Sequence, residues 1–189
     1  MPAHQPAPST ADRPLPKLAE ALERAAALDP LAGLYDRISG AVVPSARPVH
    51  DELRGRSLGH PAHSIMTDAP IGLWTSAMVL DLTRPDGHAA ASRRLVGLGL
   101  LAASPTALAG LADYRALTKP ARRVAALHAT FNGIGTVLAL ASWSARRAGH
   151  DRLGAALTLV GMGAVGAGGF LGGHVAQAMH EPGDVPGTQ

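Results

Sequence analysis

Seven polar residues stand beside or inside long apolar stretches of this 189-residue chain, and they are of types that bind metals or carry protons. Four of them are His60, His63, His128 and His174, and the others are Asp68, Asp113 and Asn132. Imidazole nitrogens bind zinc, copper and iron, and two histidines on facing helices can be the axial ligands of haem. Carboxylates can add ligands or orient the rings. The residues therefore suit a site for haem or a transition metal.

Two other interpretations of the same residues stay open. Histidine and aspartate side chains can form a proton or ion relay, because imidazole titrates near neutral pH. They can also form hydrogen bonds between helices and fix the packing. No spacing decides among the three: the His60 to His63 pattern, H-P-x-H, is not the H-E-x-x-H of zinc hydrolases. Asn132 follows His128 by four residues, which places the two on one helix face.

Long runs without a charged residue must position these side chains. Three such runs cover 95–112, 124–145 and 153–179, and a helix needs roughly 20 apolar residues to cross a bilayer. A fourth, shorter run begins at Ala69 and becomes long enough when its polar ends are included. A soluble bundle would need amphipathic helices around it, which the chain lacks. We therefore predict four membrane spans, and they cover 64–83, 94–113, 123–144 and 153–178.

Short, charged connections join these spans, so neighbouring helices are expected to be antiparallel. The predicted fold class is all-α: an integral membrane up-down four-helix bundle with both termini on one side. In this topology the seven polar residues all lie near one membrane face. The charged residues of the opposite face, such as Asp81 and several arginines, are expected to be ordinary loop residues.

The rest of the chain is predicted to lie outside the membrane. Residues 1–16 have a disordered composition, 17–57 form an amphipathic helical extension and linker, 58–180 form the membrane domain, and 181–189 form a polar tail. Asp29 and Pro30 predict the start of a short helix, which Gly40 and Pro44 end. The extension could dock on the membrane surface, on a partner or on the loops.

Glycines at small-xxx-small spacing mark the last span. They form the pairs Gly168/Gly172 and Gly169/Gly173. Such a face lets a second helix approach closely, either within the bundle or in a homo-oligomer.

Charge and composition restrict location and partners. The net charge of +3 comes mainly from arginines between the spans, a pattern that suits anionic lipid headgroups and not nucleic acid. The predicted location is the plasma membrane. Six basic residues flank the spans on each side, so the positive-inside rule does not choose an orientation. A long N-terminal segment without a signal peptide favours cytoplasmic termini.

Four segments in order resemble the bacterial membrane protein family called domain of unknown function 2231. They are GHPAHSIMTDAPIGLWTSAMVLDL, GLADY, RVAALHATFN and GFLGGHV, and the resemblance covers about residues 58–176. It implies a four-span membrane domain. The matching positions are His60, Pro61, Pro70, Gly72, Asp81, Asp113, His128, Asn132, Gly173 and His174. Some relatives carry a Rieske-type iron-sulfur domain, so the resemblance also implies a redox setting; with no cysteine here, such a cluster would belong to a separate redox protein.

The leading functional hypothesis is a redox-associated or metal- or haem-binding membrane protein. The first alternative is a proton or small-solute conduit, and the second is a non-catalytic scaffold whose N-terminal helices recruit a partner. No set of nucleophile, base and orienting residue is recognisable, so the sequence does not predict an enzyme.

Overall fold

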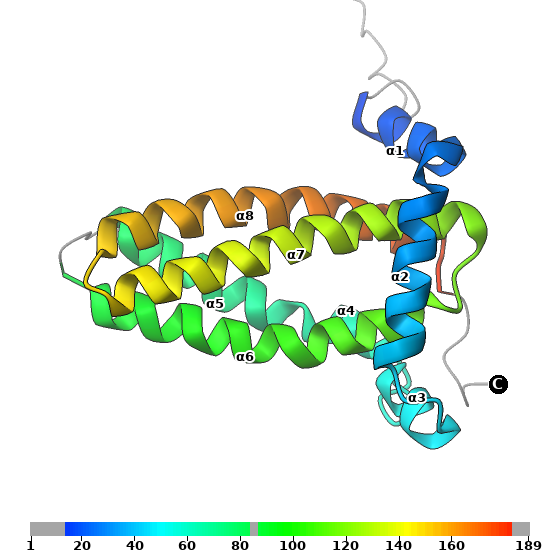
Figure 1. Ribbon diagram of the computed structural model, residues 1–189, viewed down its shortest axis with the longest axis horizontal. Coiled ribbons are helices and arrows are strands. Elements are labelled where there is room, and N and C mark those ends of the chain that lie inside the picture. The colour runs from blue at the N-terminus through cyan, green and yellow to red at the C-terminus, as the bar shows by residue number, and fades with distance from the viewer. Residues whose placement is uncertain (1–13, 84–86, 183–189) are drawn as a thin grey trace, which may run out of the picture.

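Long helices that lie side by side dominate the structure (Figure 1). The computed structural model describes residues 14–83 and 87–182, and in these residues it contains helices and no strand. The long helices are α5 (Asp68–Thr83), α6 (Ala89–Tyr114), α7 (Lys119–Arg147) and α8 (Asp151–Gly173). The chain runs up and down along them, as the short connections predict. The all-helical prediction is confirmed.

Three helices are long and apolar enough to cross a membrane. They are α6, α7 and α8, the last with its π-helical continuation η3 (His174–Ala178). Short turns separate these helices. Pro120 lies in the first turn of α7, and Gly149, with a φ of 82°, makes the turn that leads into α8. Three of the four predicted spans therefore have a matching helix.

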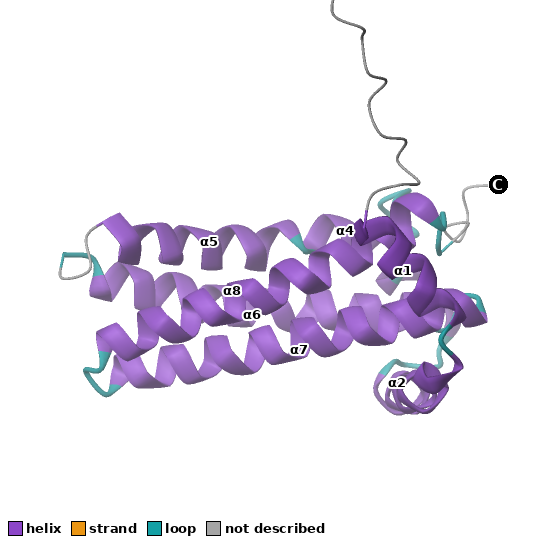
Figure 2. Cartoon of the chain, turned by 90° about the horizontal axis from the view of Figure 1, so that it is seen from above, coloured by secondary structure: helices purple, strands orange, loops and turns teal. Residues whose placement is uncertain are grey.

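The first predicted span differs from the others because it is divided. The short helix α4 (Ala62–Met66) ends one residue before α5, and α5 has only 16 residues. Pro70 has no N–H to donate to the Met66 carbonyl, which lies four residues earlier. That carbonyl instead accepts a hydrogen bond of 3.2 Å from the Thr106 hydroxyl of α6. Figure 2 shows α4 continuing α5 along the same edge of the long helices.

Small residues set the distance between the long helices. The closest pairs are α5 with α6 and α7 with α8. A methyl group added at Gly135 of α7 would lie 2.5 Å from Val165 of α8, so these backbones approach more closely than side chains would allow. Between α5 and α6, the buried Trp74 indole donates a hydrogen bond of 3.2 Å to the Val96 carbonyl.

The N-terminal helices lie across one end of the long helices (Figure 1). They are α1 (Pro14–Arg24), the 3-10 turn η2 (Ala26–Leu28), α2 (Asp29–Val42) and α3 (Arg47–Leu53). The Tyr114 hydroxyl at the end of α6 donates to the Ala32 carbonyl at 2.9 Å, and Ser39 donates to the Leu111 carbonyl at 2.7 Å. The extension is thus attached to the ends of α6 and α7.

The predicted boundaries of the tails fall mostly outside the described residues. Of the predicted disordered tail, 1–16, residues 1–13 lie outside them and residues 14–16 begin α1. Of the predicted polar tail, 181–189, only residues 181 and 182 are described. The helix predicted to begin at Asp29 and Pro30 is α2, which ends at Val42.

Candidate functional site

Two of the predicted histidines lie next to each other between the helices. His63 of α4 and His128 of α7 have ring centroids 5.9 Å apart, with the ring planes nearly perpendicular at 88°. Both side chains are half-buried. Residues that are 65 positions apart in the chain therefore form a pair, as the antiparallel arrangement of the helices predicts.

Hydrogen bonds fix the orientation and the tautomer of each ring. His63 Nδ1 lies 2.9 Å from the Thr106 carbonyl oxygen, and His128 Nδ1 lies 2.7 Å from the Gly168 carbonyl oxygen. A carbonyl oxygen only accepts, so each Nδ1 carries the hydrogen and donates it. In the neutral ring the other nitrogen, Nε2, then has a lone pair and no hydrogen. Both histidines are held in the form that can bind a cation through Nε2.

Asn132 lies against the His128 ring. Its amide nitrogen is 3.3 Å from His128 Nδ1 and 3.2 Å from His128 Nε2. An atom so nearly equidistant from both ring nitrogens lies over the face of the ring, because a position in the ring plane would overlap the carbon between them. The amide thus covers the ring and lies within hydrogen-bond distance of Nε2.

Glycines make room for the three side chains. A methyl group added at Gly110 would lie 2.8 Å from His63 Nδ1, one at Gly172 would lie 2.6 Å from the His128 ring, and one at Gly168 would lie 2.8 Å from Asn132 Oδ1. The two glycine pairs predicted for helix packing therefore have different surroundings. Gly168 and Gly172 face α7, whereas added methyl groups at Gly169 and Gly173 would meet nothing within 4 Å.

The other predicted site residues have different surroundings. His174 Nε2 lies 2.6 Å from a Glu23 carboxylate oxygen of α1, and Asp113 forms an ion pair of 3.4 Å with Arg54. His60 and Asp68 are exposed. The described residues contain no group of three or more His, Asp or Glu side chains that could hold a metal ion. Of the seven predicted residues, the structure thus brings His63, His128 and Asn132 together.

A second polar group lies at the opposite end of the helices, where only ordinary loop residues were expected. Arg146 of α7 is 2% exposed and donates two hydrogen bonds to the Asp81 carboxylate of α5, at 3.0 Å and 2.5 Å. Its Nε also lies 3.2 Å from the Ser142 hydroxyl, which is 2.8 Å from the Thr158 hydroxyl of α8. The expectation was wrong for Asp81 and Arg146.

A weak sequence signal could have indicated this group. Ser142 and Arg146 are four residues apart, as are Gly154 and Thr158, so each pair lies on one helix face. Gly154 is needed because an added methyl group would collide with the Arg146 side chain. Arg146 and Arg147 are adjacent, however, and their sequence context does not show which of the two is buried.

Comparison with known proteins assigns the family. Residues 59–180 match the family described as predicted membrane protein (DUF2231), in agreement with the resemblance seen in the sequence. The comparisons with curated proteins and with solved structures found no match. The matched region covers well over half of the chain and includes both polar groups described above. The chain belongs to the DUF2231 family of predicted membrane proteins.

Proposed function

We propose that this protein is a four-span membrane protein whose His63–His128 pair binds one transition-metal ion. The observation that carries the proposal is the pair itself: two imidazoles from different helices, each with its Nδ1 hydrogen donated to a backbone carbonyl. Histidines that bind metals usually donate their other ring N–H in this way. Imidazole suits copper, iron, nickel and zinc, and the site would take an ion from this class.

The separation of the rings is compatible with one ion between them. A metal–nitrogen bond is ~2 Å long and a ring nitrogen lies ~1 Å from its centroid, so two imidazoles on one ion have centroids ~5 Å apart at a tetrahedral angle and ~6 Å apart on opposite sides of the ion. A direct N–H···N hydrogen bond of ~2.9 Å would bring the centroids to ~5 Å. The separation in the protein is 5.9 Å.

The close packing around the rings favours an ion over haem. Gly110 of α6 and Gly172 of α8 place helix backbone directly against the His63 and His128 rings. Because the described residues supply two histidines and no larger ligand group, the remaining coordination positions of the ion would be taken by water or by a small ligand. Open positions of this kind are typical of catalytic metals, which bind water or substrate there, and less typical of structural zinc.

The experiment is metal analysis of the purified protein. In mild detergent, wild-type protein loaded with Cu, Fe, Ni or Zn salts in turn and desalted should retain about one equivalent of one ion, as the single pair predicts. His63→Ala and His128→Ala should each reduce retention to background, whereas His60→Ala, which changes an exposed histidine, should retain the wild-type amount. A visible spectrum recorded on the same samples tests for haem. A Soret band that is present in wild type and lost in both variants would show that the pair binds haem and not a single ion.

Proton uptake is the second candidate function, and the small number of ligands favours it. Two neighbouring bases suffice to hold a proton, whereas most metal sites use three or four protein ligands. If wild-type protein retains no metal and has no Soret band, the metal proposal fails. Proton flux into liposomes that depends on His128 would then support the proton function. If His128→Ala lowers the thermal stability and changes neither metal retention nor proton flux, the role of the pair is purely structural.

A further inference from the structure

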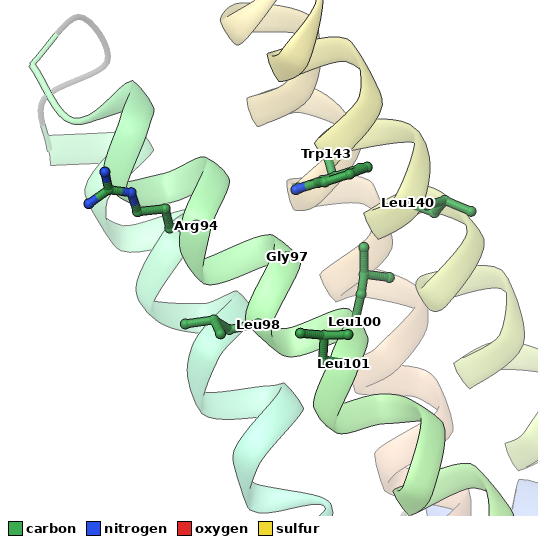
Figure 3. Close-up of a pocket in the computed structure, with 7 residues that line it drawn as sticks. All are labelled: Arg94, Gly97, Leu98, Leu100, Leu101, Leu140 and Trp143. Carbon is green, nitrogen blue, oxygen red and sulfur yellow. The ribbon is translucent and has the colours of Figure 1, made fainter.

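A groove on the outer surface of α6 and α7 has the composition of a lipid site. It encloses about 480 Å³, and Figure 3 shows the residues that line it. The lining residues are Arg94, Gly97, Leu98, Leu100, Leu101, Leu140 and Trp143. Leu98, Leu101 and Leu140 are more than half exposed. Since α6 and α7 are candidate membrane spans, these leucines face the bilayer, where acyl chains surround them.

Trp143 closes the groove toward α6. Its indole extends across the gap between the helices in Figure 3, and an added methyl group at Gly97 would lie 2.8 Å from the indole nitrogen. The same tryptophan lines a neighbouring hollow of about 400 Å³ together with Arg93 and Arg147. The apolar groove therefore adjoins a basic hollow at the ends of α6 and α7, and Trp143 lines both.

Three arginines at this end have no acidic partner among the residues that the structure describes. In residues 14–83 and 87–182, no carboxylate forms an ion pair with Arg93, Arg94 or Arg147. The Arg147 guanidinium lies over the Trp143 ring, 4.8 Å from its centroid. By contrast, Arg146 of the same helix is neutralised by Asp81 inside the protein. The outer arginines can therefore pair with an anion from outside the described residues.

We propose that this groove binds an anionic phospholipid. The phosphate would lie among the Arg93, Arg94 and Arg147 guanidinium groups, and one acyl chain would lie along Leu98 and Leu101. Leu101 is seven residues, or ~10 Å of helix, deeper than Arg94, which matches a headgroup at the interface and a chain in the hydrocarbon. Basic hollows between membrane helices bind anionic headgroups in this manner. The site is separate from the histidine pair and does not depend on the metal proposal.

Fluorescence quenching of Trp143 tests the site. The wild-type protein is placed in phosphatidylcholine vesicles that contain a small fraction of lipid brominated on the acyl chain, either phosphatidylglycerol or phosphatidylcholine. At equal mole fraction, brominated phosphatidylglycerol should quench the Trp143 fluorescence in preference to brominated phosphatidylcholine, with an apparent preference of roughly tenfold. The preference should disappear in Trp143→Phe, because the remaining Trp74 is only 5% exposed.

Arginine variants assign the headgroup contact. In the triple variant Arg93→Gln/Arg94→Gln/Arg147→Gln, the preference for phosphatidylglycerol over phosphatidylcholine should fall to about twofold or less. Arg94→Gln alone should lower this preference several-fold. Arg152→Gln, which changes an exposed arginine at the same end, should keep the wild-type preference. Equal quenching by the two lipids in wild type, or a preference that survives the triple change, would overturn the proposal. Weak quenching by both lipids would instead indicate that a second copy of the chain covers the groove.

Discussion

At the scale of single residues, the buried Arg146–Asp81 pair is expected to be sensitive to the loss of either partner. Asp81→Leu leaves the Arg146 guanidinium buried without its counter-ion, so we expect the free energy of unfolding to fall by about 3 to 5 kcal/mol. The double variant Asp81→Leu/Arg146→Met removes both charges and should recover most of this loss. Thermal unfolding in mild detergent, followed by circular dichroism, measures both effects.

A surface arginine supplies the control for this prediction. Arg152→Met, at an exposed position in the first turn of α8, should change the free energy of unfolding by no more than about 0.5 kcal/mol. If the double variant is as unstable as Asp81→Leu alone, the loss comes from disturbed packing and not from the unpaired charge.

Neighbouring glycines of α8 give a second prediction at this scale. Gly172→Ala would place a methyl group 2.6 Å from the His128 ring, whereas Gly173→Ala would place one in open space. Both changes have the same intrinsic effect on the helix. We therefore expect Gly172→Ala to be less stable than Gly173→Ala by about 1 to 3 kcal/mol, and to retain less metal. Equal stability would show that the His128 ring can move away without cost.

The candidate site could be predicted from the sequence only in part. His128 and Asn132 share a helix face by their spacing, and antiparallel helices bring His63 near them. The partner of His174 could not be predicted, because Glu23 lies 151 residues away on a helix whose packing the sequence leaves open. Arg146 was missed because a charged residue next to a loop is usually solvated, and only the Asp81 contact identifies it as buried.

At the scale of secondary-structure elements, hydrophobic length and the turn residues predict most of the fold. The uncharged runs correspond to α6, α7 and α8, and Asp29 with Pro30 begins α2. The division of the first predicted span at Thr67 was not foreseen. Pro70 is compatible with the first turn of a helix, so its presence alone did not show that the helix would restart there. The Thr106 hydroxyl that caps the Met66 carbonyl belongs to another helix.

The attachment of α2 to α7 is expected to depend on pH. Hydrogen bonds from Arg123 and Lys119 lower the pKa of Asp29 to about 2, well below the usual range of an aspartate. A carboxylate with a lowered pKa stabilises the folded arrangement above the unfolded pKa, and this contribution disappears as the pH falls through the folded value. We therefore expect the N-terminal helices to loosen between about pH 4 and pH 2. Pepsin is active in this range, and its cleavage between α1 and α3 measures the loosening.

A variant at the same position isolates the carboxylate. Asp29→Asn keeps the shape of the side chain but cannot ionise, so its N-terminal helices should be cleaved at the same rate at both pH values. Asp36→Asn, at an ion pair of 3.4 Å with Arg122, should retain the wild-type increase in cleavage on acidification. An unchanged rate of cleavage in wild type would show that the hydrogen bonds of Tyr114 and Ser39 hold the extension without Asp29.

At the scale of the whole molecule, the number of membrane crossings decides where both polar groups lie. The α4 and α5 helices together cover Ala62 to Thr83, which is ~33 Å at 1.5 Å per residue and matches a hydrocarbon core of ~30 Å. With four crossings, α5 reaches the same membrane face as the start of α6, and the Arg146–Asp81 pair is enclosed by helices within the bilayer. With three crossings, α5 would lie outside the lipid, although it packs along α6 and α8, which are both candidate membrane spans. This packing is our reason for expecting four crossings.

Cysteine labelling distinguishes the two topologies, because the chain has no cysteine of its own. We expect single cysteines at Ser57 and Thr118 to react with a membrane-impermeant maleimide from one side, and those at Gly87 and Ala148 from the other. All four positions are exposed. Three crossings would instead place Ser57 and Gly87 on the same side. Labelling in vesicles of known orientation also shows which membrane face carries Ser57 and Thr118. The equal numbers of basic residues on the two faces do not decide this. We expect Ser57 to face the cytoplasm.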